Sequence, residues 1–195
     1  MKIYKNTTVL EESLNRIRFL FDEFEEVVGG FSGGKDSTVV LNLALQVAEE
    51  KNRLPLKVFW IDQEAEWQHT VDYCEKVFSD PRVEPMWFQI PMVWYDNVSF
   101  KKDKIYIWKE GDKWIRPKSE KSIKENIYLD FGFHELFERI FRVHFKQSAC
   151  YLSGVRTQES PKRFMSLTSA LTYKTITWGK VLNKNLKHYT FYPIS

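Results

Sequence analysis

Cysteine is scarce in this sequence, and its scarcity excludes several kinds of site. Cys74 and Cys150 are the two cysteines among 195 residues, and they form no Cys-x-x-Cys pair. Two thiols cannot by themselves hold an iron–sulfur cluster or a structural zinc ion, so we expect neither. Both lie in apolar stretches and are expected to be core residues, and without a secreted context we expect no disulfide.

Long hydrophobic runs are also lacking. No stretch of about 18 apolar residues occurs, and the opening MKIYKNTTVLEESLNR has no apolar segment typical of a secretory signal. We therefore expect a cytoplasmic protein with no membrane partner.

Net charge is small, at +3 for the whole chain, which does not by itself indicate a nucleic-acid partner. The excess is local, because residues 99–125 contain nine Lys or Arg and five Asp or Glu, interleaved with tryptophan and tyrosine. Such a segment could stack bases and hold phosphates. It could equally be an amphipathic hairpin with solvated lysines, so both hypotheses stay open.

Alternating helix and strand patterns predict an α/β fold. EVVGGF and LKVFWI are continuous apolar runs, which are typical of parallel strands covered on both faces. We predict a single domain over 1–195, a three-layer, doubly wound fold with a mostly parallel sheet of about five strands. The expected elements are helix 8–24, strand 26–31, a helix from about 37, strand 56–61, helix 66–79, strand 84–90, helix 133–146, strand 149–154 and a strand within 189–195.

Residues 91–131 interrupt this alternation. They are polar, charged and aromatic without a clear period. We expect a long basic and aromatic insertion, with a hairpin that turns at Glu110-Gly111-Asp112.

The stretch VVGGFSGGKDSTVV, residues 27–40, predicts an anion-binding loop. A glycine-rich turn between an apolar strand and a helix directs backbone N–H groups and the positive end of the helix dipole at one point. The stretch nearly matches a Walker A loop, whose magnesium ion would also contact Asp62. Asp36, however, stands where that loop needs a hydroxyl, so a Walker-type kinase is disfavoured.

Residues 32–37, Ser-Gly-Gly-Lys-Asp-Ser, resemble the pyrophosphate loop of the N-type ATP pyrophosphatases, which share the adenine nucleotide α-hydrolase-like fold. FWIDQEAEWQHT (59–70) and SGVRTQESPKR (153–163) resemble segments of the phosphoadenosine phosphosulfate (PAPS) reductases, and YPIS (192–195) resembles a further segment of that family. The loop, the strand near Asp62 and the tryptophan-rich insertion are most similar to the immunoglobulin-binding regulator A-like proteins of bacteria and phages.

The resemblance implies a site for PAPS or ATP, with magnesium if ATP is the ligand. It implies catalytic roles for Lys35, Asp36 and Arg156, and metal contacts for Asp36 and Asp62. Asp36 could also cap the helix that follows the loop. The residues expected to bind the nucleotide are Phe31, Ser32, Gly33, Gly34, Lys35, Asp36, Ser37, Trp60, Ile61, Asp62, Gly154, Arg156 and Arg163.

The sequence departs from the PAPS reductases in one respect that bears on its chemistry. Their C-terminal Glu-Cys-Gly-Leu-His segment does not occur here, and the C-terminal part of the family domain is expected to be missing. Two interpretations stay open. One is sulfo-, phospho- or adenylyl-group chemistry on a bound adenine nucleotide, with a protein partner that supplies a thiol. The other is a nucleotide-sensing regulatory or partner protein without turnover.

Overall fold

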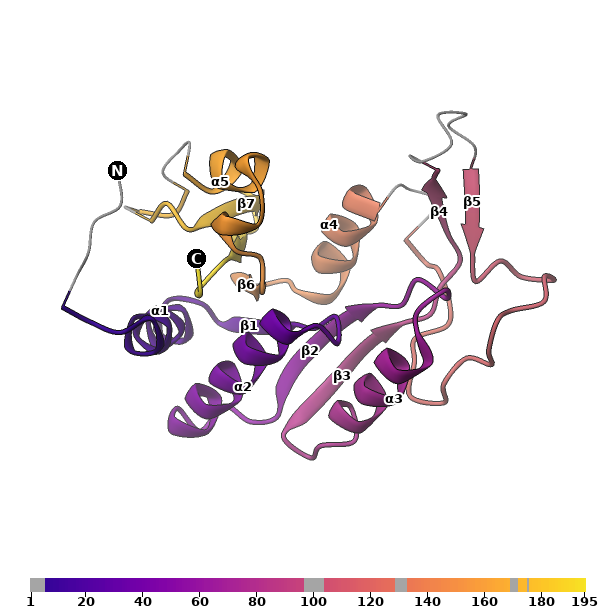
Figure 1. Cartoon of the computed structure of the whole chain (residues 1–195), viewed down its shortest axis with the longest axis horizontal. Helices are drawn as coiled ribbons and strands as arrows, with labels where there is room; N and C mark the ends of the chain where they lie inside the picture. Colours follow the sequence, from indigo (N-terminus) through magenta and orange to yellow (C-terminus); the bar gives the residue numbers. More distant parts are fainter. Residues whose placement is uncertain (1–5, 97–103, 129–132, 169–171, 175) are drawn as a thin grey trace.

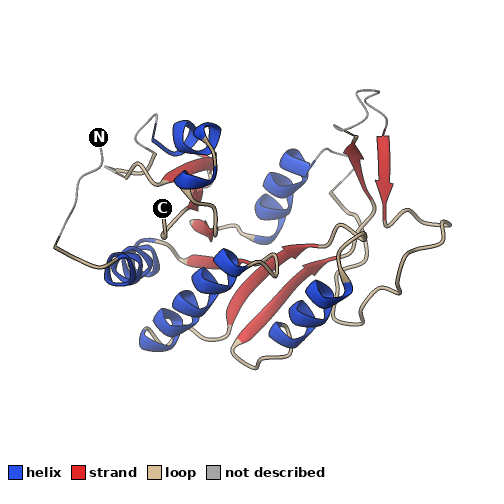
Figure 2. Cartoon of the chain, viewed as in Figure 1, coloured by secondary structure: helices blue, strands red, loops and turns tan. Residues whose placement is uncertain are grey.

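The computed structural model describes residues 6–96, 104–128, 133–168, 172–174 and 176–195, and within them a six-stranded sheet forms the centre of the fold (Figures 1 and 2). Its strand order is β3-β2-β1-β6-β8-β7, and every pairing is parallel except that of β7 with β8. The strands are β1 Glu26–Gly30, β2 Leu56–Ile61, β3 Val83–Phe88, β6 Ala149–Leu152, β7 Gly179–Asn183 and β8 His188–Phe191.

Helices cover both faces of this sheet, which confirms the predicted three-layer α/β fold. Successive residues of β1 show the division, because Val27 packs in a core with α1, α2 and α3, whereas Val28 packs in a second core with α4. The same alternation separates Trp60 from Ile61 in β2. The helices are α1 Val9–Glu23, α2 Lys35–Glu50, α3 Gln68–Val77, α4 Phe133–His144 and α5 Pro161–Thr168, with a 3-10 turn, η1, at Thr157–Glu159.

The N-terminal helix begins where its sequence predicts. The hydroxyl of Thr8 accepts a hydrogen bond from the backbone N–H of Glu11 at 3.1 Å, and the Glu11 carboxylate accepts one from the backbone N–H of Thr8 at 2.8 Å. This reciprocal arrangement satisfies two N–H groups that an uncapped helix would leave without a partner.

The insertion differs from its predicted form. Its strands are β4 Met92–Tyr95 and β5 Lys104–Ile107, which pair antiparallel with each other. The expected hairpin turn at Glu110-Gly111-Asp112 is therefore wrong, because β5 pairs with a segment before it in the chain and 110–112 lie in an exposed loop. Lys101 and Lys102 lie outside the described residues.

After β5 the chain returns to the edge of the main sheet. Ile123 forms an isolated parallel bridge with Phe88, and its backbone N–H donates to the carbonyl of Trp87 at 2.7 Å. The insertion thus occupies part of the open edge of β3, which would otherwise present unpaired backbone groups.

Two further elements near the C-terminus were not expected. The edge strand β7 makes six strands rather than about five, and α5 follows directly after η1. β7 is short, and Lys180 and Val181 in it are exposed, so its sequence lacks the continuous apolar run that revealed the inner strands. In the part of the chain that the structure describes, no helix has the length and apolar character needed to cross a bilayer.

Candidate functional site

The turn between β1 and α2 presents the first N–H groups of α2 without a side-chain cap. The helix begins at Lys35, and its N-cap residue, Gly34, provides no side chain to accept from them. The chain enters this position through Gly33, whose φ of +71° is a backbone conformation that favours glycine. These N–H groups and the helix dipole together form a site suited to an anion.

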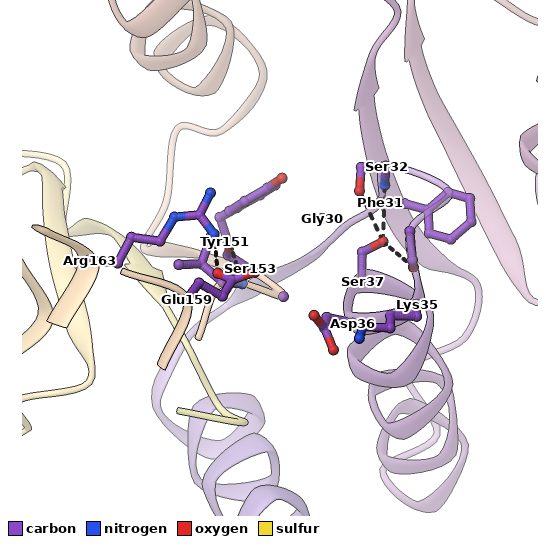
Figure 3. A pocket seen from close by; sticks show the side chains of 13 residues that line it. Gly30, Phe31, Ser32, Lys35, Asp36, Ser37, Tyr151, Ser153, Glu159 and Arg163 are labelled. Carbon is purple, nitrogen blue, oxygen red and sulfur yellow. Dashed lines mark hydrogen bonds and ion pairs between the residues drawn. The ribbon is translucent and has the colours of Figure 1, made fainter. Parts of the chain in front are cut away.

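Two serines fix the shape of this turn. The Ser37 hydroxyl donates to the carbonyl of Gly34 at 2.9 Å, and it accepts from the backbone N–H of Ser32 at 3.3 Å (Figure 3). The two serine hydroxyl oxygens are 3.1 Å apart. Because these bonds link both sides of the turn, the loop has a defined shape before any ligand arrives.

The segment after β6 packs directly on the start of α2. A Cβ atom at Gly154 would lie 2.6 Å from the backbone nitrogen of Ser37 and 2.8 Å from the carbonyl carbon of Asp36. Real Cβ atoms do not approach backbone atoms this closely, so a glycine is required here. The packing brings two segments, 32–37 and 153–155, to the same end of the parallel sheet.

These two segments line a polar cavity of about 430 Å³. Arg163 and Glu159, which form an ion pair, lie across the cavity from Lys35 and Ser37 (Figure 3). The lining residues are Gly30, Phe31, Ser32, Gly34, Lys35, Asp36, Ser37, Tyr151, Ser153, Gly154, Val155, Glu159 and Arg163.

Asp36 does not cap the helix, contrary to one expectation. It lies in the first turn of α2, which begins two residues earlier than predicted, so its side chain is past the N-cap position. Its carboxylate instead lies 3.3 Å from Nε of Arg156. Asp36 and Arg156 thus neutralise each other at the edge of the anion site.

A second, more apolar cavity of about 400 Å³ adjoins the first. The two share the lining residues Phe31, Ser32, Tyr151, Ser153 and Val155, so they form one continuous depression. The lining residues of the apolar part alone are Phe59, Trp60, Ile61, Gln63, Glu66, Phe137, Lys180, Leu182, Thr190 and Tyr192.

Among the described residues that line this apolar part, Glu66 is the one with a carboxyl group. Burial raises the pKa of the Glu66 carboxyl above its ordinary value, and the negative charge of Asp62 raises it further. Burial also raises the pKa of the Tyr151 hydroxyl well above its usual range, so this group is a neutral hydrogen-bond donor at the junction of the two cavities.

Asp62 does not line either cavity. It is fully buried, and its carboxylate accepts hydrogen bonds from Nε1 of Trp87 at 3.1 Å, from Nε2 of Gln89 at 2.9 Å and from the backbone N–H of Glu64 at 2.9 Å. Arg116 from the insertion completes the set with an ion pair. The structure therefore does not bring Asp62 and Asp36 together as metal ligands.

Both cysteines are free and buried, as the sequence indicates. Burial raises the pKa of the Cys74 thiol to about 12, and burial raises the pKa of the Cys150 thiol well above its usual range. Neither thiol is therefore a nucleophile in this conformation.

Most of the residues predicted from the sequence line one of the two cavities; Gly33, Asp62 and Arg156 do not. The lining residues that sequence reasoning missed include Tyr151, Ser153, Lys180 and Tyr192. Tyr151 and Ser153 lie beside the recognised Gly154 segment, so the end of a parallel strand could have indicated them. Lys180 lies on β7, which no sequence signal revealed.

Comparison with protein families matches residues 26–177 to the phosphoadenosine phosphosulfate reductase domain. Among curated proteins the chain is 28% identical over 181 residues to YbdN of Escherichia coli (strain K12), itself uncharacterized. The match covers 87% of this chain and 44% of YbdN, so the chain spans less than half of that relative.

Among solved structures the chain is similar to two of Candida glabrata FMN adenylyltransferase. One is a complex with FMN and the ATP analogue AMPCPP, which matches with a TM-score of 0.53 and 14% sequence identity. The other is a complex with FAD and inorganic pyrophosphate, which matches with a TM-score of 0.54 and 12% sequence identity. Each match covers the whole of this chain and 56% or 55% of that protein. At these identities the likeness shows a shared fold.

Proposed function

Because this chain belongs to the phosphoadenosine phosphosulfate reductase domain family, we propose that it binds an adenine nucleotide, PAPS or ATP, in the depression between α2, β6 and β8. The observation that carries this proposal is the continuity of an anion site with an apolar cavity. A molecule with phosphates at one end and a flat base at the other matches both parts. Phe31, Trp60 and Ile61 would flank the base.

The residues of the polar part would hold the anionic end. Backbone N–H groups of residues 32–37 would donate to phosphate or sulfate oxygens, and Lys35 would supply a mobile positive charge. Arg163 would add a planar, permanently charged donor from the opposite side. Arg156, which pairs with Asp36 beside the start of α2, would turn into the cavity to add a second. Each forms an ion pair with a carboxylate, and a phosphate would compete for that cation. Asp36, released from Arg156, would be a carboxylate ligand for magnesium beside the ATP phosphates.

The two ligands lead to different chemistry. With ATP, an acceptor would attack the α-phosphorus and the bond to the β-phosphate would break. Pyrophosphate would be the leaving group, and the loop would hold it until release. With PAPS, reduction of the sulfo group requires electrons from a thiol. The buried Cys74 and Cys150 do not fit this role, so a separate thiol protein would be the reductant. A nucleotide sensor without turnover is the alternative, favoured by the same buried thiols.

A nucleic-acid partner stays a prediction that the described cations of the insertion do not favour. In the described part of the insertion, Lys109 pairs with Asp112 at 3.4 Å and Arg116 pairs with Asp62. Lys118 lies over a tryptophan ring at 4.5 Å. These cations are engaged within the protein, which leaves fewer of them to contact a phosphate backbone. The closer similarity to immunoglobulin-binding regulator A-like proteins also stays a prediction.

Calorimetric titration with PAPS and with ATP and magnesium tests the proposal, each repeated on Lys35→Ala. Binding of PAPS that the variant loses would favour sulfonucleotide chemistry, and the next assay would supply a dithiol protein and measure sulfite. Binding of ATP alone would favour adenylyl transfer or sensing, which the release of pyrophosphate would distinguish. Binding of neither ligand would contradict the proposal.

A further inference from the structure

The short loop after β2 separates the nucleotide site from the insertion. Within this loop, residues 62–66, Gln63 and Glu66 line the apolar cavity, and Gln63 and Glu64 also line a groove against β4 and β5. One face of the loop thus belongs to the proposed base-binding cavity, and the other face contacts the insertion.

The described residues of the insertion make five polar contacts with this loop. The Glu64 carboxylate accepts from the backbone N–H of Trp108 at 2.6 Å and of Ile115 at 3.1 Å. The indole N–H of Trp108 donates to the carbonyl of Asp62 at 2.8 Å. Arg116 donates to both the Asp62 carboxylate and the Glu64 carbonyl. Arg116 therefore donates to the loop at two residues, more than any other side chain does in the five contacts between described residues.

The loop has a conformation that requires such support. Glu64 has a φ of +63°, in the left-handed region that a residue with a side chain adopts at a cost of about 1 kcal/mol. Asp62 is fully buried, and Arg116 provides the positive charge that compensates its carboxylate. Without Arg116 the loop loses the charge partner of the Asp62 carboxylate and the N–H donor to the Glu64 carbonyl.

We infer that Arg116 is a positioning residue for the nucleotide site: through Asp62 and Glu64 it sets the loop that forms one wall of the base-binding cavity. This inference rests on the proposed function. The insertion then acts as a brace within the chain: it holds the loop at residues 62–66 in place, and the affinity for the base depends on that loop. The phosphate loop lies at the end of a different strand, β1, and is held by its own hydrogen bonds between Ser32, Gly34 and Ser37, which include none of these five contacts.

We therefore predict that loss of Arg116 changes the affinity for ATP and leaves the affinity for pyrophosphate unchanged. Arg116→Met should weaken ATP binding by about tenfold, within the range found for residues that act through a packed network. Inorganic pyrophosphate, which lacks a base, should bind the same variant within twofold of the wild-type affinity. Arg116→Lys keeps the charge but not the two-pronged donor, so its ATP affinity should lie between those of the wild type and Arg116→Met.

Isothermal titration with ATP and magnesium, and separately with pyrophosphate, measures both affinities. Lys113→Met is the matched control, because it removes one exposed positive charge from the same loop of the insertion. Loss of ATP affinity with pyrophosphate affinity retained, in Arg116→Met alone, would support the brace. Equal loss of both ligands, or wild-type ATP affinity in the variant, would refute it while the proposed function stands. Failure of the wild type to bind either ligand would refute both.

Discussion

Gly154 offers the sharpest test of how the two segments of the site fit together. In Gly154→Ala the new methyl group would lie 2.6 Å from the nitrogen of Ser37, whereas ordinary van der Waals contact begins at 3.4 Å. The two segments must therefore separate by about 0.8 Å, because the three atoms nearest to the added methyl group all belong to the backbone and not to a flexible side chain. Overpacking of this kind typically costs about 1–3 kcal/mol of unfolding free energy.

The same displacement should weaken anion binding. The nitrogen of Ser37 belongs to the first turn of α2, whose N–H groups we propose as donors to phosphate. A shift approaching 1 Å takes such donors away from good hydrogen-bond distance, and we expect pyrophosphate affinity to fall by about tenfold or more. Urea unfolding gives the stability change and calorimetric titration gives the affinity change.

Gly111→Ala is the control for a loss of stability alone. Gly111 has a φ of +83° in the exposed loop of the insertion, and no atom lies within 4 Å of its added Cβ. Alanine there should cost about 1 kcal/mol through backbone strain without changing pyrophosphate affinity. If Gly154→Ala bound pyrophosphate as the wild type does, the anion would not lie against this end of α2, and the reasoning would fail.

Three further predictions concern other parts of the chain. Cys74 and Cys150 should resist a thiol reagent at pH 8 in the native protein and both react in denaturant; rapid native labelling would contradict their burial. Because the pKa of Glu66 is raised, its carboxyl in the folded state keeps a proton that it loses in the unfolded state. The free energy of unfolding should therefore fall as pH rises from about 4.5 through the raised pKa. Urea titrations at several pH values should show this fall in the wild type and not in Glu66→Gln. Thr8→Ala should cost about 1 kcal/mol in thermal or urea unfolding through loss of the capping box, with ATP affinity unchanged.

Much of the fold could be predicted because its signals are local. The runs at 26–30 and 56–61 are buried on both faces, and the capping box at Thr8 fixes a helix start within four residues. The turn at 32–37 needs glycine and small hydroxyl residues whatever surrounds it, so the sequence reveals it directly. The close packing of Gly154 on α2 also follows from topology, since both segments follow neighbouring parallel strands.

The remainder depends on contacts between distant segments. Asp62 lies at a strand end, which made it a candidate ligand, but an arginine 54 positions later occupies its carboxylate. No local pattern indicates that pairing. The antiparallel edge strand that contains Lys180 also owes its place to β8, because alone it is too short and too polar to signal a strand.

The central claim is that a nucleotide phosphate binds the N–H groups of residues 32–37. Amide chemical-shift mapping of the ¹⁵N-labelled protein, titrated with ATP and magnesium, tests it most directly. We predict the largest shifts at Gly33, Gly34 and Ser37, with smaller ones at residues 153–155, and their loss on substitution Lys35→Ala. Saturating shifts confined to the other end of the sheet, with residues 32–37 unmoved, would contradict the claim.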